Sequence, residues 1–457
     1  MKKRVLVGLA LAFAVGLAAP SLATEAGKER VSPSDSLDDI IEDVFTIDTT
    51  IRRNALMRLV ERGKTDVVAP LIDALFFVGD AEDIGDALKE LTKADVIANW
   101  HQWMLWQEDH PKITPYAGYD AFKADLMARI DPNFQLFLKP GIARDIRLEE
   151  IAWGGVVKDG IPALTNPALI PADGAKYLWA SELVFGVSIN GDARAYPFRI
   201  MDWHEMFNDV IGGVPVSLAY CTLCGSGILF DARVPGRDKP FVFGSSGFLY
   251  RSNKLMYDQE THSLWNQFTG QPVVGSLVGS GIELKTLPVA ITTWGDWRAR
   301  HPETKVLSLE TGFARDYTPG KPYDSYFRSP NLMFPAQAPD PRLKPKDFVF
   351  ALRLPGHEKA WPLARFEGGA VVNDDVGGLS VVLVGDAATR SVRAYKSEGR
   401  VFAISANLRE VMTKDGAWRI EEEALVAADG RKLDRLPGHI AYWFAWSNFK
   451  RGKPFGG

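Results

Sequence analysis

The chain of 457 residues carries 57 acidic and 53 basic side chains, which leaves a net charge of −4, and 46% of its residues are apolar. This composition excludes disordered and fibrous proteins, and the length predicts roughly two or three domains. The mildly acidic balance without basic runs argues against nucleic acid as the main partner, and two cysteines are too few for a disulfide-rich scaffold.

The first residues predict a secretory signal peptide. A basic start at 2–4 precedes an uncharged run at 5–19, and the small residues Ser21 and Ala23 suit cleavage after residue 23. The run is too short to remain in a bilayer as a spanning helix, and no later stretch qualifies as a membrane span. We therefore expect an exported, soluble protein once 1–23 is removed, periplasmic in a cell with two membranes.

The next hundred residues predict helices, because apolar side chains recur there at three- and four-residue steps. Segments 51–62, 66–77 and 80–92 are separated by short polar links and resemble antiparallel helix pairs of a repeat array. We interpret 24–140 as an additional helical layer of the main domain rather than an independent binding module, because three helical segments are the bare minimum for a solenoid.

An internal repeat follows, in a part of the chain rich in Gly, Pro and β-branched residues. Residues 185–198 match 350–363, and 208–213 match 373–378 at the same offset of 165. Further on, a pair of tryptophans recurs at an offset of 149, Trp294 and Trp297 matching Trp443 and Trp446. We therefore predict an α+β fold in which the helical segment precedes two copies of a β-rich unit, packed as a pseudo-symmetric body.

The repeat also sets the expected boundaries. The first β-rich unit occupies 141–318 and contains a Trp-His-Glu and a Cys-x-x-Cys motif, and the second, at 346–457, lacks both. Residues 319–345, rich in Pro, Asp and Ser, are expected to form a linker or surface loop.

Local signals predict the first elements of the first unit. Strands 184–189 and 193–197 should form a hairpin, because Asn-Gly at 190–191 tolerates the positive φ angles of a tight turn. Residues 202–211 are expected to form a short helix that two glycines end, and 214–220 a buried strand.

The Cys-x-x-Cys motif is the sharpest chemical signal. Cys221 and Cys224 follow the predicted strand, and Gly225 and a second strand-like run come next, so a tight turn is expected rather than a thioredoxin-type helix. Such a turn is typical of a metal knuckle, in which two thiolates reach one ion. A small-loop disulfide would fit the same residues in an oxidising compartment.

His204 is the nearest candidate for a third ligand. Asp202 is expected to cap the short helix, and Ile200, Phe207 and Ile211 to share a face with the imidazole, which would then point inward against the sheet. A buried histidine that merely satisfies its own hydrogen bonds would have the same pattern.

The second unit keeps the hairpin, glycine and tryptophan pattern without the candidate ligands. Its matching positions hold Gly369 for His204, Asp386 for Cys221 and Thr389 for Cys224. The three candidate ligands are therefore additional to the scaffold.

Several motifs together resemble a known family. They are Trp153-Gly154-Gly155, the hairpin at 190–197, Trp203-His204-Glu205 and the run 220–227. These are similar to exported bacterial proteins of the domain of unknown function 3179 family, over roughly 145–450. The resemblance implies no established activity, and it leaves the helical segment outside.

The leading hypothesis is an exported protein that binds copper or zinc through Cys221, Cys224 and His204, because soft thiolates with one imidazole suit Cu(I) or Zn(II). Three ligands leave a coordination position open, and in an enzyme the metal would transfer electrons or act as a Lewis acid, with Glu205 or Asp258 handling protons.

Two other classes stay open. One is a metal-free thiol enzyme for disulfide exchange or acyl transfer, with a cysteine thiolate polarised by His204. The other is a non-catalytic envelope scaffold with a structural disulfide. The expected partner is a small molecule or an envelope protein.

Overall fold

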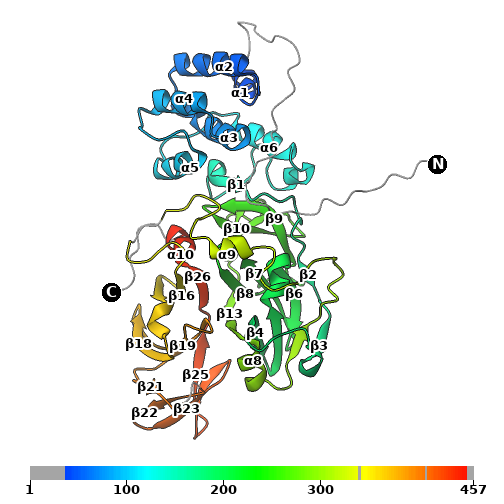
Figure 1. Cartoon of the computed structure of the whole chain (residues 1–457), viewed down its shortest axis with the longest axis vertical. Helices are drawn as coiled ribbons and strands as arrows, with labels where there is room; N and C mark the ends of the chain where they lie inside the picture. The colour runs from blue at the N-terminus through cyan, green and yellow to red at the C-terminus, as the bar shows by residue number, and fades with distance from the viewer. Residues whose placement is uncertain (1–35, 338–340, 407–408, 450–457) are drawn as a thin grey trace, which may run out of the picture.

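The first part of the chain folds into helices that pack on one end of a larger β-rich body (Figure 1). The computed structural model describes residues 36–337, 341–406 and 409–449; the predicted signal peptide lies outside them. The fold is mixed α+β, as the sequence predicts. Within the described ranges, every helix is too short or too polar to cross a membrane.

The helical segment alternates α-helices with short turns and a few 3-10 turns. Its helices are α1 (Leu37–Val44), α2 (Thr49–Arg62), α3 (Val68–Val78), α4 (Glu82–Thr92), α5 (Trp100–Asp109) and α6 (Tyr119–Ala128), with 3-10 turns at Thr65–Val67, Pro132–Leu136 and Leu148–Glu150. The three helices predicted from periodicity are confirmed as α2, α3 and α4. α3 is buried on nearly every side because α1, α4 and α5 all pack against it.

The helices share one hydrophobic core with a sheet of the β-rich body. That sheet has the order β1 (Ile151–Trp153), β9 (Phe243–Tyr250), β10 (Asn253–Asp258), β11 (Leu264–Asn266) and β12 (Gln271–Val274). Phe134 lies 4.4 Å from Phe248 between ring centroids, and Phe76 meets Trp153 edge to face. Because these side chains belong to one buried cluster, the helical segment forms a layer of the body.

The first β-rich unit contains two more sheets. One has the order β13 (Thr286–Leu287), β8 (Ser226–Asp231), β7 (Val214–Cys221), β6 (Met206–Ile211) and β2 (Leu164–Thr165); the other has the order β14 (Ala290–Thr293), β4 (Leu183–Ile189), β5 (Asp192–Pro197), β15 (Lys305–Leu307) and β3 (Leu169–Pro171). A 3-10 turn at Ala172–Gly174, helix α7 (Phe198–His204) and helix α8 (Trp294–Arg300) complete it. The Asn190-Gly191 hairpin and the buried strand β7 are confirmed.

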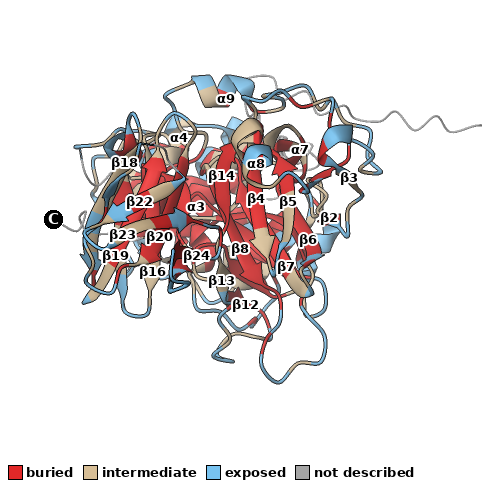
Figure 2. Cartoon of the chain, turned by 90° about the horizontal axis from the view of Figure 1, so that it is seen from below, coloured by how far each residue is buried: buried red, intermediate tan, exposed pale blue. Residues whose placement is uncertain are grey.

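The second unit contains a three-stranded and an eight-stranded sheet. One sheet has the order β17 (His357–Pro362), β16 (Phe348–Leu354) and β26 (His439–Tyr442). The other has the order β18 (Ala370–Val376), β19 (Leu379–Asp386), β20 (Ser391–Lys396), β25 (Lys432–Leu436), β24 (Ala424–Ala427), β23 (Gly416–Ile420), β22 (Glu410–Thr413) and β21 (Ala403–Ile404). A 3-10 turn at Leu363–Phe366 and helix α10 (Trp443–Phe449) complete it. Figure 2 shows the central strands as buried, whereas the edge strands β18 and β22 of the second unit are mostly intermediate or exposed.

The short helix expected at 202–211 is wrong in place and extent. α7 begins after Pro197 and ends at His204, because Glu205 adopts a left-handed conformation with φ of 55°. Residues 206–211 form strand β6 instead, and they pair antiparallel with β7. Asp202 therefore lies inside the helix and does not cap it.

The segment between the units is more structured than the predicted linker or loop. It contains helix α9 (Asp324–Arg328), and the side chains of Tyr323 and Tyr326 are buried against the first unit.

Candidate functional site

The Cys-x-x-Cys motif forms the tight turn between β7 and β8. Cys221 pairs with Ser226 at the end of the ladder, and the amide of Cys224 donates to the carbonyl of Cys221 at 3.1 Å. Gly225 has a φ of 60°, which a residue with a side chain adopts at a cost. The two cysteines form a disulfide with their Cα atoms 5.2 Å apart, so the turn is confirmed and its sulfurs are bonded to each other.

Three distant segments hold this turn. The Tyr326 hydroxyl on α9 donates to the carbonyl of Leu223 at 2.8 Å, and the Tyr442 amide on β26 donates to the carbonyl of Cys224 at 2.8 Å. The Cys224 sulfur lies 3.2 Å from the carbonyl oxygen of Ser252. Cys224 is fully buried and Cys221 is 4% exposed, so both cysteines are buried and Cys221 has the larger exposed fraction.

Glu205 connects α7 to this turn. Its amide donates to the carbonyl of Met201 and its carbonyl accepts from the Tyr220 amide, each at 2.7 Å, which fixes the residue between helix and strand. The Glu205 carboxylate accepts from the Thr222 hydroxyl, between the cysteines, at 2.7 Å. The structure thus brings the predicted proton-handling residue Glu205 to the cysteine turn.

A buried lysine pairs with the same carboxylate. The Lys254 ammonium on β10 forms an ion pair with Glu205, and their side chains are only 5% and 9% exposed. The Tyr323 hydroxyl donates to Glu205 at 3.1 Å, and the pKa of Tyr323 is well above its usual value because of burial and the nearby carboxylate. The sequence analysis missed Lys254 and Tyr323; the lysine directly before the apolar residues 255–257 of β10 was the one available signal.

His204 lies in a different contact. Its Nδ1 is 2.8 Å from the carbonyl oxygen of Pro162, and its Nε2 is 2.7 Å from the Tyr317 hydroxyl. Since a carbonyl only accepts, Nδ1 carries the proton and Nε2 accepts from Tyr317. Burial lowers the pKa of His204 to about 4, so the ring is neutral.

The structure does not bring His204 together with the cysteines as one ligand set. Across the described ranges, no group of three or more His, Cys, Asp or Glu side chains is arranged to hold a metal ion. His204 is the last residue of α7, and both nitrogens of its imidazole are engaged by Pro162 and Tyr317. Binding of copper or zinc stays a prediction.

Asp258, the other predicted proton-handling residue, organises a turn. Its carboxylate accepts from the Thr261 amide at 2.6 Å, the Thr261 hydroxyl at 2.7 Å and the Trp265 indole at 2.9 Å. These donors belong to the β10–β11 connection and to β11 itself, so the structure places Asp258 with this hairpin and not with Glu205.

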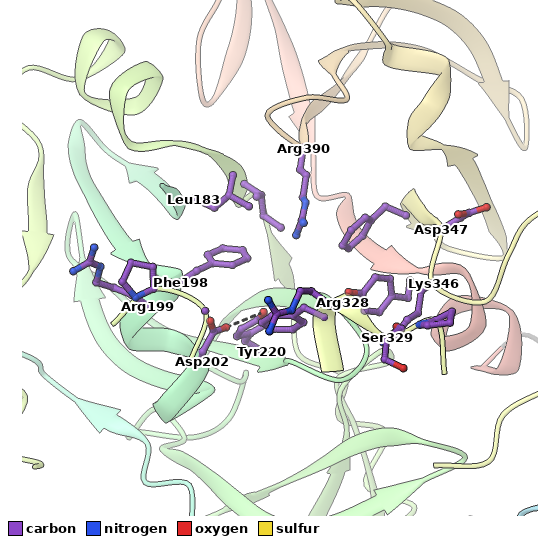
Figure 3. Close-up of a pocket in the computed structure, with 18 of the residues that line it drawn as sticks. Leu183, Phe198, Arg199, Asp202, Tyr220, Arg328, Ser329, Lys346, Asp347 and Arg390 are labelled. Atoms are coloured by element: carbon purple, nitrogen blue, oxygen red, sulfur yellow. Dashed lines mark hydrogen bonds between the residues drawn. The ribbon is translucent and has the colours of Figure 1, made fainter. Parts of the chain in front are cut away.

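Gly225 is one of the residues that line a cavity of about 650 Å³ (Figure 3). Asp202 and Tyr220 line it from the first unit, and the Tyr220 hydroxyl donates to Asp202 at 3.2 Å. Arg390 and Tyr442 line it from the second unit. Sequence reasoning missed this cavity because its walls come from segments about two hundred residues apart.

Comparison with known proteins gives one match. The family model described as "Protein of unknown function (DUF3179)" matches residues 158–453. No curated protein and no solved structure matches the chain.

Proposed function

The chain belongs to the DUF3179 family, and we propose that it is a thiol–disulfide oxidoreductase whose redox centre is the Cys221–Cys224 pair. The observation that carries the proposal is the position of this disulfide: the residue between its cysteines, Thr222, is hydrogen-bonded to the buried Glu205–Lys254 ion pair. Burying a charged pair this completely costs desolvation free energy, and a role beside the cysteines would explain why the pair is kept there.

A purely structural role for the disulfide has little to support it. The bond closes a loop between residues three apart, and so short a loop restricts the unfolded chain less than a long loop would. The β19–β20 turn of the second unit has the same ladder closure, Asp386 pairing with Ser391, and it forms without sulfur.

We also infer that the two β-rich units are related copies in a pseudo-symmetric body, which makes that comparison meaningful. The order β14-β4-β5 corresponds to β26-β16-β17, and β13-β8-β7-β6 to β25-β20-β19-β18. The contacts between units are reciprocal, because β26 packs on β8 while its counterpart β14 packs on the counterpart strand β20.

The chemistry is a two-electron exchange with a thiol substrate. One substrate thiolate attacks the sulfur of Cys221, the less buried of the two residues, and the S–S bond breaks with Cys224 as leaving thiolate. A second substrate thiolate attacks the mixed disulfide, which releases an oxidised substrate disulfide and leaves both cysteines reduced. The substrate loses two electrons and the cysteine pair gains them. The reduced Cys224 thiol has the Ser252 carbonyl, 3.2 Å away, as an acceptor.

Glu205 and Lys254 act as positioning residues in this proposal. They supply a negative and a positive charge one hydrogen bond from the turn, and they tune which cysteine carries the thiolate. Export, predicted from residues 1–23, would place the pair in a compartment where disulfides persist.

The test is a redox titration of the folded protein. The chain is equilibrated in thiol–disulfide buffers, alkylated and weighed by mass spectrometry. We expect a reversible two-electron couple between about −120 and −270 mV, the range of catalytic pairs. A disulfide with a reduction potential below about −300 mV, or one that is reduced only when the protein unfolds, overturns the proposal.

Two further measurements sharpen the result. Thr222→Val removes the hydrogen bond to Glu205 and keeps both cysteines, so it should shift the pH profile of cysteine alkylation, whereas Thr261→Val, which removes a hydroxyl from the remote Asp258 turn, should not. Metal analysis of the reduced protein tests the copper or zinc prediction. One tightly bound metal per chain would replace the oxidoreductase by a metal-binding function.

A further inference from the structure

We propose that the cavity between the β7–β8 turn and the β19–β20 turn binds a small carboxylate with an apolar or aromatic body. Gly225 lines it from the first turn and Arg390 from the second. Its volume of about 650 Å³ lies in the range of pockets that enclose small organic ligands.

The charge of the ligand follows from the cations in the cavity. Arg390 and Lys346 both line it, and within the described part of the chain neither has a carboxylate at salt-bridge distance. The other two arginines are already paired, Arg199 with Glu182 and Arg328 with Asp324. The cavity therefore has uncompensated positive charge, which an anion would neutralise.

Arg390 is held in place for such a contact. Its guanidinium lies 4.3 Å from the centre of the Phe348 ring, and Phe348 stacks on Tyr442 at 4.5 Å. Figure 3 shows the Arg390 side chain extending into the cavity toward Phe198, while the Asp347 carboxylate points away at the rim. The planar fork of a guanidinium matches the two oxygens of a carboxylate.

The backbone supports the same assignment. Arg390 has a φ of 52° in its turn, and the residue at the matching position of the first turn is Gly225, with a φ of 60°. Glycine adopts this conformation freely, whereas an arginine is strained there. Strain retained where glycine would fit indicates that the side chain is used.

The other residues that line the cavity indicate the apolar body and the head group of the ligand. Phe198, Leu183 and Ile291 add apolar surface to the aromatic pair, which favours a carboxylate on an apolar body over a strongly hydrated inorganic phosphate. Asp202 lines the same cavity, and its carboxyl group accepts a hydrogen bond from the Tyr220 hydroxyl at 3.2 Å.

The identification of this ligand as the substrate rests on the proposed function, since the exchanging thiol or disulfide would carry the carboxylate. Binding itself does not require the cysteines. We therefore separate the two by measuring affinity in a Cys221→Ser/Cys224→Ser variant and reactivity in the unmodified chain.

The binding experiment uses calorimetry with naphthalene-2-carboxylate, the uncharged naphthalene-2-carboxamide and inorganic phosphate. We expect the carboxylate to bind the wild-type chain and the double Ser variant alike, and the amide and phosphate to bind about tenfold more weakly or not at all. Arg390→Gly, which matches Gly225 and relieves the turn, should lower carboxylate affinity about tenfold without loss of stability. Arg298→Gln, on the exposed face of α8, is the matched control and should change nothing.

Three outcomes would overturn the assignment: no binding of the carboxylate, equal binding of the amide, or unchanged affinity in Arg390→Gly. The substrate role is tested separately with disulfide reagents and the reduced protein. Arg390→Gly should slow oxidation by the anionic 5,5′-dithiobis(2-nitrobenzoate) but not by the neutral 4,4′-dithiodipyridine. If the carboxylate binds but Arg390→Gly slows both disulfide reagents equally or neither, the binding site stands and its proposed role in the cysteine reaction is refuted.

Discussion

Reduction of the Cys221–Cys224 disulfide should lower the free energy of unfolding by no more than about 2 kcal/mol. The bond closes a loop between residues three apart, and the loop-entropy relation gives about 2 kcal/mol for four residues, compared with about 3 kcal/mol for fifteen. The reduced sulfurs stay in the same buried site, where the Ser252 carbonyl accepts from the Cys224 thiol. The loss should therefore lie at or below the loop estimate.

The assay is urea denaturation followed by tryptophan fluorescence, with oxidised and reduced protein compared at one pH. Because the helical segment and the β-rich units could unfold in separate steps, the transition of the β-rich body is the one to compare. Cys221→Ala/Cys224→Ala is the matched variant, and it should be insensitive to reductant. A loss of about 4–5 kcal/mol on reduction would identify the bond as a structural staple and refute the reasoning behind the redox proposal.

Three further predictions concern buried charge. Glu205→Gln leaves Lys254 buried without a counter-charge and should lower the free energy of unfolding, measured by urea denaturation, by about 3–5 kcal/mol. Glu205→Leu combined with Lys254→Met should restore most of this lost stability. No recovery in the double variant would contradict a buried ion pair. Acid should destabilise the fold as the pH falls from 6.5 toward 4, because the pKa of His204 is about 4 in the folded chain and the imidazole of the unfolded chain binds a proton at higher pH. His204→Gln should remove the part of this pH dependence that His204 causes. An NMR titration midpoint of His204 near 6.5 would refute the prediction. Glu422→Gln should cost about 3–5 kcal/mol, because the carboxylate lies buried between Arg393 and Arg435, and thermal unfolding identical to wild type would show that the two arginines find other partners.

The sequence predicted those turns and helices that are determined by residues close together in the chain. The Asn190-Gly191 turn occurs because both residues adopt positive φ, and α2, α3 and α4 form where the apolar periodicity lies. The cysteine turn was predicted for the same reason, since Gly225 follows the second cysteine and supplies the left-handed conformation.

The short helix around His204 was misplaced because a tertiary contact overrides the local pattern. Asp202 followed three residues later by Glu205 resembles a capping box, but Glu205 ends the helix and its carboxylate is turned toward Lys254 on a strand forty-nine positions away. Periodicity also failed at 206–211, because the apolar residues of a doubly buried strand match helical spacing as well.

The candidate site was predicted only where its residues lie in one motif. The motifs contain Cys221, Cys224 and Glu205, and the structure joins them. Lys254, Tyr323 and Arg390 reach the turn or the cavity through the topology of the sheets, so no spacing in the sequence connects them.

The arrangement of the cavity walls has a consequence for how the protein matures. A ribosome makes the cysteines more than two hundred residues before Tyr442, whose amide holds the carbonyl of Cys224. The β7–β8 turn can therefore meet an oxidant while its covering strand is still unsynthesised, and the bond can form before the pocket exists. An incomplete chain would carry both sulfurs without Tyr442, which lines the cavity, so the proposed binding site is complete only once β26 has been made.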